Sequence, residues 1–214
     1  MRKTKIKFDK PIYLGFSILD LSKTLMTDFV YKYLKPTYGD RATICYTDTD
    51  SIICTVETPD IYKDMNEHGR QWFDTSNYPS DHLSGIEVGL NSKDLGMFKD
   101  ECAGSPMTEF VGLRPKMYAF KVGTRETKRA KGVKKNIVKN EMNFADYKTC
   151  LDMHRVSYRT MNMIRSRDHQ IYTLECRKKA LSADDYKRYI LSDVISTLAH
   201  GHYRIEINEQ HTRE

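Results

Sequence analysis

The residues best suited to chemistry form the run Tyr46-Thr47-Asp48-Thr49-Asp50-Ser51. Asp48 and Asp50 are two positions apart, and residues with that spacing in a β-strand point to the same face. Neighbouring carboxylates repel each other unless a cation lies between them. Mg²⁺ suits such a pair because it prefers oxygen ligands and is commonly bound through one or two carboxylates together with substrate phosphates. The run therefore predicts a Mg²⁺ site with Asp48 and Asp50 as its ligands, and Mn²⁺ is the alternative ion.

Two other interpretations of this run stay open. Asp-x-Asp is common in plain turns, where it binds nothing. The same pattern also binds manganese and nucleotide sugars in many glycosyltransferases, although the alternating strand and helix units that normally precede it there are not evident in this sequence.

A second pair of interest is Lys116 and Tyr118, within Leu113-Arg114-Pro115-Lys116-Met117-Tyr118. Read as strand residues two apart, they place an ammonium group and a phenol on one face, where they could hold a phosphate and a sugar. The alternative is an ordinary strand lysine and tyrosine without a ligand.

Positive charge is concentrated just after this pair. Between Arg114 and Lys139 there are ten Lys or Arg and one acid, Glu126, so this stretch carries +9 while the whole chain of 214 residues carries +6. Such a concentration is typical of a surface that faces a polyanion, although a charge run can also be a solvated face or a nuclear localisation signal. The candidate DNA-binding cations within it are Lys128, Arg129, Lys131, Lys134 and Lys135.

The elements that must position these residues follow from periodicity. Apolar residues at helical spacing predict a long helix over 17–34, stopped by Pro36 and Gly39, and two β-rich runs at 42–46 and 51–56 predict a hairpin with Asp48 and Asp50 at its tip. Asp60 is expected to cap a short helix that reaches Trp72, followed by a loop over 74–93. Further predicted elements are strands at 95–101, 108–122 and 170–174, with Gly112 and Pro115 marking a bend or an edge position in the second, and helices at 142–153 and 183–191.

Composition limits the class of protein. No run approaches the roughly 18 apolar residues of a membrane span, and the basic residues 1–7 lead into no apolar segment, so we expect an intracellular protein, nuclear or cytoplasmic, without a secretion signal or a membrane partner. The five cysteines are scattered and never form a Cys-x-x-Cys pair, which argues against a disulfide framework or a zinc site and predicts buried free thiols.

Taken together, the motifs resemble those of a known family. Tyr-x-Asp-Thr-Asp-Ser in a hairpin resembles motif C of family B DNA polymerases, Lys116-Met117-Tyr118 resembles their Lys-x-Tyr motif, and Lys128 to Lys135 is similar to the basic segment that begins their thumb. The order of the three motifs is also that of the family. The protein-primed polymerases of Polinton (Maverick) transposons and related viruses and plasmids are the most similar branch.

The resemblance implies a DNA-directed DNA polymerase that binds primer-template DNA and deoxynucleoside triphosphates, with a terminal priming protein as a further candidate partner. Asp50 would be the principal metal ligand and Asp48 the second, while Lys116 and Tyr118 would hold the primer terminus. Motif A (Asp-x-x-Ser-Leu-Tyr-Pro) and motif B (Lys-x-x-x-Asn-Ser-x-Tyr-Gly), which supply a third carboxylate and a triphosphate-binding lysine in the family, do not occur in this sequence. We therefore expect a C-terminal fragment without activity of its own.

The expected fold is α+β, with a palm segment over 1–127 (long helix, catalytic hairpin and antiparallel sheet) and a small thumb over 128–214. The competing hypothesis is a DNA-binding remnant of a transposon or viral polymerase that has lost the chemistry.

Overall fold

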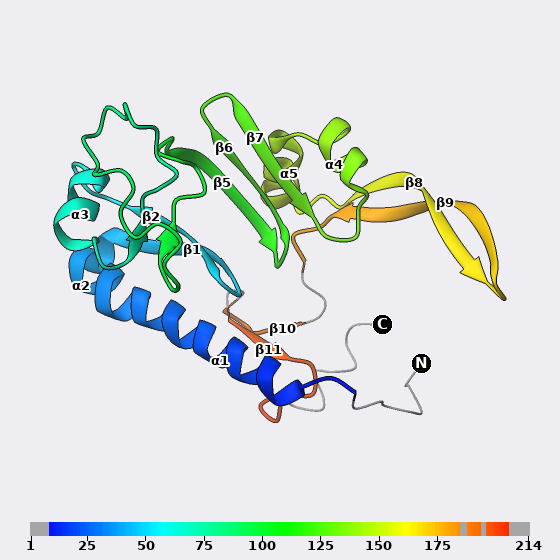
Figure 1. Ribbon diagram of the computed structural model, residues 1–214. Coiled ribbons are helices and arrows are strands. Elements are labelled where there is room, and N and C mark those ends of the chain that lie inside the picture. The colour runs from blue at the N-terminus through cyan, green and yellow to red at the C-terminus, as the bar shows by residue number, and fades with distance from the viewer. Residues whose placement is uncertain (1–8, 185–187, 194–195, 206–214) are drawn as a thin grey trace. The chain divides into compact units, whose positions relative to one another are not determined.

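The computed structural model describes residues 9–184, 188–193 and 196–205, and it divides into two compact units, Met1–Thr108 and Glu109–Glu214 (Figure 1). Both units mix helices with small, mainly antiparallel sheets, as expected for an α+β chain. The boundary between the units, after Thr108, falls within β5 (Met107–Arg114), and the junction predicted at 127/128 falls within β7 (Arg125–Ala130).

The first unit begins with a long helix and continues with a hairpin and a loop-rich region. Its elements are α1 (Ile12–Asp28), a π-helical segment (Phe29–Leu34), α2 (Lys35–Tyr38), a 3₁₀ turn (Gly39–Arg41), β1 (Ala42–Asp48), β2 (Ser51–Val56), α3 (Ile61–His68), β3 (Phe73–Asp74) and β4 (Phe98–Lys99). The long helix, the hairpin and the Asp60-capped helix are thereby confirmed, although α3 ends at His68 instead of Trp72. Of the strand expected over 95–101, only β4 is formed.

The helix continues past Pro36, contrary to the prediction that it stops there. Proline lacks an N–H group and its ring clashes with the carbonyl four residues earlier in a regular α-helix. Here the preceding turn is π-helical, with the Lys35 N–H donating to the carbonyl of Val30, so the chain is wider just before the proline. The helix ends at Gly39, the second of the two predicted stop residues, whose φ of 58° lies in the left-handed region.

An aromatic cluster joins the C-terminal end of this helix to the hairpin. Phe29, Tyr33, Leu34 and Tyr38 are buried, and Ile52, Cys54 and Val56 of β2 pack against them together with rings from α3 to β4. The Phe29 ring lies 4.2 Å from that of Phe98 and meets that of Phe73 edge to face. The hairpin is therefore attached to the helix through one face of β2.

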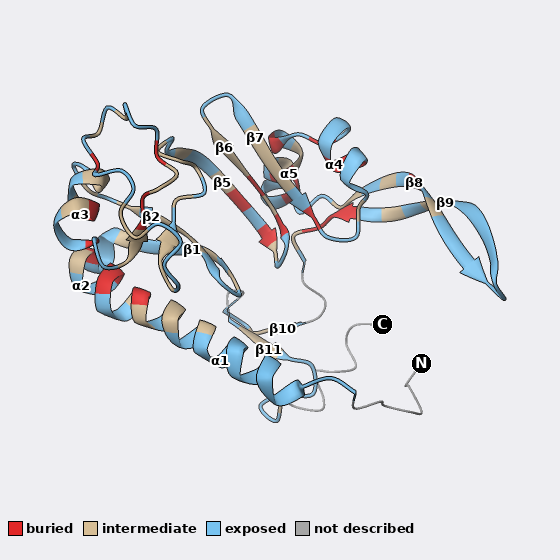
Figure 2. Cartoon of the chain, in the orientation of Figure 1, coloured by how far each residue is buried: buried red, intermediate tan, exposed pale blue. Residues whose placement is uncertain are grey.

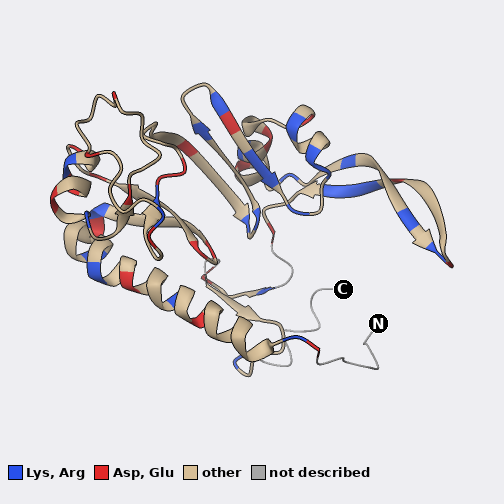
Figure 3. Ribbon diagram, viewed as in Figure 1, with Lys and Arg blue, Asp and Glu red and all other residues tan. Residues whose placement is uncertain are grey.

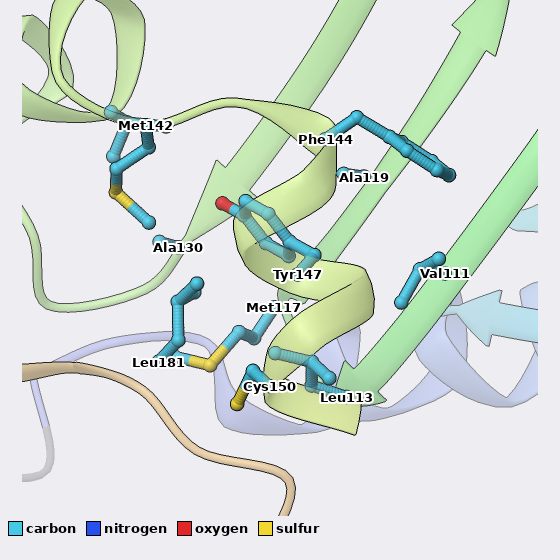
Figure 4. Packing of buried hydrophobic residues seen from close by; sticks show 11 residues of the cluster. Val111, Leu113, Met117, Ala119, Ala130, Met142, Phe144, Tyr147, Cys150 and Leu181 are labelled. Carbon is cyan, nitrogen blue, oxygen red and sulfur yellow. The ribbon is translucent and has the colours of Figure 1, made fainter. Parts of the chain in front are cut away.

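The second unit consists of a three-stranded antiparallel sheet covered by short helices, followed by a long ribbon. Its elements are β5 (Met107–Arg114), β6 (Met117–Val122), β7 (Arg125–Ala130), α4 (Lys135–Asn140), α5 (Phe144–Asp152), β8 (Ser157–Arg167), β9 (Gln170–Leu181), β10 (Arg188–Ile190) and β11 (Thr197–Ala199). The core lies between the sheet and α5, where Val111, Met117 and Ala119 pack with Tyr147 and Leu181 (Figure 4).

Three of the elements predicted for this unit take a different form in the structure. The strand expected over 108–122 is a hairpin, and it turns at Pro115 and Lys116, where a bend or edge position was predicted; the strand at 170–174 is part of the ribbon β8–β9. The helix predicted over 183–191 is wrong, because residues 188–190 form β10, paired with β11; residues 185–187 lie outside the described part of the chain. Of the five free cysteines only Cys150 is buried, so the expectation of buried thiols holds for that residue alone.

Candidate functional site

The acidic hairpin closes through a two-residue turn. Asp48, the last residue of β1, is opposite Ser51, the first of β2, so Thr49 and Asp50 alone form the turn. Thr49 has a left-handed φ of 59°, which a tight hairpin turn of this length requires. Asp48 therefore belongs to the strand and Asp50 to the turn, and the strand alternation from which a common face was predicted does not extend to Asp50.

Hydrogen bonds within the turn hold its backbone in place. The Asp50 N–H donates to the Asp48 carbonyl at 2.7 Å, and the Ser51 hydroxyl donates to the same carbonyl at 3.2 Å. The Thr49 hydroxyl donates to Oδ1 of Asp48 at 3.2 Å. Ser51 thus supports the turn through the backbone, whereas Thr49 is the residue that contacts a carboxylate.

The donor set at this tip fits a magnesium ion that shares its ligands with a substrate. Asp48 is half-buried and Asp50 is exposed, so phosphate oxygens and water could reach both carboxylates. Among the described residues there is no group of three or more His, Cys, Asp or Glu side chains that could hold a metal. Two carboxylates are within the usual protein contribution to a Mg²⁺ site, but they form no closed cage.

A bulge shapes the strand that carries Asp48. The register shifts between Ile44 and Tyr46, so Cys45 is the extra residue on β1. Bulges increase strand twist and change the direction of the residues that follow them. The bulge could not be predicted from the sequence, because Cys45 continues an ordinary β-rich run.

Lys116 and Tyr118 differ in setting. Lys116 is exposed in the turn between β5 and β6 with a left-handed φ of 61°, and its carbonyl accepts a hydrogen bond from the Lys131 N–H at 3.0 Å. Tyr118 lies within β6, on the face opposite the buried Met117 and Ala119. The prediction that Lys116 and Tyr118 share a strand face is therefore not met, because Lys116 is not in a strand.

Tyr118 belongs to a row of aromatic rings that the sequence analysis missed. Its ring centroid lies 6.0 Å from that of Phe110 on β5 and 6.3 Å from that of Phe120, to which it is nearly parallel. Arg129 is opposite Tyr118 across the β6–β7 ladder, so it emerges on the same face. The available signal was the period-two spacing of Tyr118 and Phe120, which places both rings on one side of a strand.

The predicted DNA-binding cations separate into two groups. Arg129, Lys131, Lys134 and Lys135 are exposed along β7, the following turn and the start of α4, where Figure 3 shows blue segments close together. Lys128 points to the inner face instead: its side chain is only 15% exposed, and its ammonium group donates to the carbonyl of Met142 at 2.6 Å. Lys128 therefore holds the α4–α5 connection and is poorly placed for a phosphate.

The most strongly perturbed carboxylate of the first unit lies away from the hairpin tip. Burial alone would raise the pKa of Asp74, but hydrogen bonds from Ser76, the Lys99 ammonium group and the Lys93 N–H outweigh it and hold that pKa far below its usual range. These partners come from both ends of the loop-rich region between β3 and β4. Asp74 therefore organises that region rather than forming a reaction site.

The predicted site residues fall in both units. Asp48 and Asp50 belong to the first unit, whereas Lys116, Tyr118 and the exposed cations belong to the second. Within the second unit, the Lys116–Lys131 backbone bond brings the start of β6 to the basic turn after β7. The predicted acidic residues therefore lie in the first unit and the predicted basic residues in the second.

Comparison of the chain with protein-family models, with curated proteins and with solved structures gives no match. Among the helices of the described residues, none is long and apolar enough to cross a bilayer.

Proposed function

We propose that this chain is the C-terminal catalytic portion of a DNA-directed DNA polymerase that resembles the protein-primed branch of family B. The observation that carries the proposal is the hairpin whose two-residue turn follows Asp48 and contains Asp50, within the run Tyr-Thr-Asp-Thr-Asp-Ser. This places two carboxylates at the end of a hairpin whose other end is attached to a packed core.

In this proposal the reaction is nucleotidyl transfer. The primer 3′-hydroxyl loses its proton to water and attacks the α-phosphorus of a deoxynucleoside triphosphate. The new P–O bond forms, the bond from the α-phosphorus to the bridging oxygen breaks, and pyrophosphate leaves with the electrons of that bond. Mg²⁺, or Mn²⁺, would supply charge stabilisation for both the attacking and the leaving oxygens. Asp50 and Asp48 would hold the metal, and the exposed tip leaves room for the triphosphate oxygens.

The second unit would hold the primer-template duplex. Arg129, Lys131, Lys134 and Lys135 are exposed and close in sequence, and such cations bind phosphates without regard to base sequence. Lys116 would contact the phosphate at the primer terminus and Tyr118 the terminal sugar. Lys128 is omitted from this surface because its ammonium group is already bonded within the fold.

The chain alone is proposed to be inactive. Two-metal transfer in the family uses a third carboxylate and a triphosphate-binding lysine, from the two motifs that this sequence lacks. These groups would have to come from another polypeptide segment.

One observation favours a second candidate function, a DNA-binding module without chemistry. The basic surface is built entirely within the second unit, so DNA binding needs nothing from the acidic hairpin. In that case the replacement of Asp48 and Asp50 by alanine would change no property of the protein in any setting.

The test is made in a polymerase completed with the two missing motifs. Asp50→Asn should reduce primer extension by about a thousandfold or more, because a neutral amide no longer balances the metal charge, while DNA binding stays within about twofold. Asp40→Asn, an exposed aspartate just before the other end of β1, is the matched control and should keep full activity. Extension by Asp50→Asn within a few-fold of the parent would refute the metal role.

A further inference from the structure

A serine and a histidine of the first unit form a pair that neither the acidic hairpin nor the basic surface uses. Both lie in the loop between β3 and β4, within the region after α3 that Figure 2 shows mostly in tan and pale blue. Oγ of Ser84 lies 2.5 Å from Nδ1 of His82, and both residues are half-buried. The Ser84 hydroxyl is therefore in contact with a base and within reach of solvent.

The direction of this hydrogen bond follows from the other side of the imidazole ring. Nε2 of His82 lies 3.1 Å from the carbonyl oxygen of Gly104, which can only accept. In a neutral imidazole one nitrogen carries the proton and the other is an acceptor. Nε2–H therefore donates to Gly104, and the Ser84 hydroxyl donates its proton to Nδ1.

The carbonyl that orients His82 is itself held in place. The Tyr62 hydroxyl donates to the same Gly104 carbonyl at 2.7 Å, and the Gly104 N–H donates to Oδ2 of Asp100 at 2.8 Å. Gly104 has a φ of 85°, and a Cβ there would collide with the His82 ring. A glycine is thus needed for this close approach of ring and backbone.

Two tyrosine rings fix the orientation of the imidazole. The His82 ring centroid lies 5.0 Å from that of Tyr62 and 5.4 Å from that of Tyr78, and both rings meet it edge to face. The Tyr78 hydroxyl donates to Asp100 at 3.0 Å, so both tyrosines are bonded to the turn that carries Gly104. The base is therefore oriented before any substrate binds.

A nucleophile beside a base that a third group orients is the arrangement found in covalent catalysis. We propose that Ser84 and His82 form a second catalytic centre, which transfers the acyl group of small carboxylic esters to water, with Ser84 as nucleophile and His82 as general base. This centre shares no residue with the acidic hairpin or the basic surface, so its test is independent of the proposed polymerase function.

The reaction has two steps. Oγ of Ser84 attacks the ester carbonyl carbon while its proton passes to Nδ1 of His82, the C–O bond to the leaving group breaks, and the leaving oxygen takes that proton. Water then attacks the acyl-serine and gives a proton to Nδ1. The C–Oγ bond breaks, Oγ recovers the proton, and the carboxylic acid leaves.

The backbone around Ser84 favours esters that react readily. Among the described residues, a single backbone N–H, that of Ile86, donates to Oγ of Ser84, at 3.3 Å, and it lies where an oxyanion would form beside that atom. Serine proteases use two such donors, and the loss of one costs roughly 100- to 1000-fold in kcat. One donor therefore favours esters with good leaving groups over amides.

A purely structural role of the pair predicts a different reactivity. A serine that only closes the turn accepts the Ile86 N–H and needs no base, so its hydroxyl remains as unreactive as that of an ordinary serine. The two roles therefore differ in how fast Ser84 of the folded chain reacts with an electrophile.

The experiment treats the full chain with a fluorophosphonate probe and, separately, with p-nitrophenyl acetate. Attack on the probe forms an Oγ–P bond and expels fluoride, so peptide mass spectrometry should find one adduct, on Ser84. Ser84→Ala should form no adduct, and His82→Gln should react about a hundredfold more slowly than the parent. Ser80→Ala and His68→Gln change exposed residues of the same unit and should react at the parent rate.

The parent unfolded in urea gives the same comparison without a substitution and should form no adduct, and thermal unfolding of each variant is measured alongside. No adduct on Ser84 of the folded parent, equal labelling in urea, or labelling of a folded His82→Gln at the parent rate would overturn the proposal. Repeated turnover of p-nitrophenyl acetate that is lost in Ser84→Ala would support transfer to water. Labelling of Ser84 without such turnover would overturn that step.

Discussion

Charged side chains are positioned differently in the acidic hairpin of the first unit and on the basic surface of the second unit. In the hairpin, one carboxylate belongs to Asp48 at the end of a strand and the other to Asp50 in a two-residue turn, whose backbone is fixed by its own hydrogen bonds. On the basic surface, the exposed cations are spread over a strand, a turn and a helix start. A metal ion needs ligands in a narrow geometry, whereas long, flexible side chains can follow the phosphates of a duplex, so each arrangement suits its proposed ligand.

The two regions also differ in how charge supports the fold. In the first unit, the ion pair of the buried Asp74 with Lys99 involves neither of the proposed metal ligands. In the second unit, one member of the basic run, Lys128, is used within the fold, while its neighbours face water. If structural and functional charges are separate in this way, replacing the first should lower stability and replacing the second should weaken ligand binding.

The largest effect on stability is expected for Asp74→Asn. The replacement removes a buried carboxylate from the Lys99 ammonium group and two backbone N–H donors, which should lower the free energy of unfolding by about 3 kcal/mol at pH 7. Because folding lowers the pKa of Asp74, its contribution is complete above the unfolded pKa of about 4 and is lost as pH falls below it.

Denaturant unfolding at pH 7 and pH 3 measures this effect. The difference in unfolding free energy between the parent and Asp74→Asn should be smaller at pH 3 than at pH 7. Asp94→Asn, an exposed aspartate of the same loop-rich region, is the control and should change stability by less than about 0.5 kcal/mol. A difference in unfolding free energy that grows at low pH would contradict the lowered pKa of Asp74 in the folded chain.

The next largest effect concerns the basic surface. Replacing Lys131, Lys134 and Lys135 by Gln should weaken binding to duplex DNA about thirtyfold at low salt, because three exposed phosphate contacts are removed. The slope of log K against log [salt] should become shallower by roughly 0.9 for each lost contact. Lys148→Gln, an exposed lysine on α5, is the control; a loss for this variant as large per charge removed as that of the triple variant would mean that DNA binding follows net charge alone.

Lys128→Met should lower stability and leave DNA binding unchanged, the reverse of the result expected for the three exposed lysines. The variant keeps the apolar stem but loses the hydrogen bonds to the carbonyls of Met142 and Lys139, so the unfolding free energy should fall by about 1–2 kcal/mol. Its salt slope for DNA should match that of the parent. A shallower slope with unchanged stability would place Lys128 on the DNA surface after all.

The smallest effect is expected for Lys116→Ala. A lysine at the primer terminus should add to the affinity for primer-template junctions and not to the affinity for blunt duplex. The variant should therefore bind junctions about fivefold more weakly and blunt DNA nearly as well as the parent. Competition binding with the two DNAs measures the ratio. Equal losses on both would reduce Lys116 to a general phosphate contact.

Elements with strong periodicity were predictable from sequence. The long helix, the two strands of the acidic hairpin and the Asp60 cap of α3 formed as expected from apolar spacing, β-rich runs and capping chemistry. The burial that accompanies the helical spacing falls at Phe29, Tyr33 and Leu34, since α1 itself contains no buried residue. The positions of the turn residues were less predictable. They depend on the strand register and on the left-handed backbone of Thr49 in one turn and of Lys116 in the other.

The ribbon β8–β9 was recognised only in part. Exposed residues such as Ile164 and Ile171 lie near its end, and a ribbon that is open on both sides has no apolar–polar alternation to detect. The inward position of Lys128 likewise depends on the α4–α5 connection, which comes later in the chain and lies above the sheet only after folding. Its role therefore could not be read from the charge run.

The most direct test of the account measures the purified chain with primer-template DNA over a range of salt, with deoxynucleoside triphosphates and Mg²⁺ or Mn²⁺ present. If about four to six phosphates are neutralised, binding should weaken with a slope of roughly −4 to −5 in log K against log [salt]. No nucleotide should be incorporated, because two carboxylates are all that the acidic hairpin provides. Binding that is absent or independent of salt, or template-dependent extension that Asp50→Asn abolishes, would contradict the account.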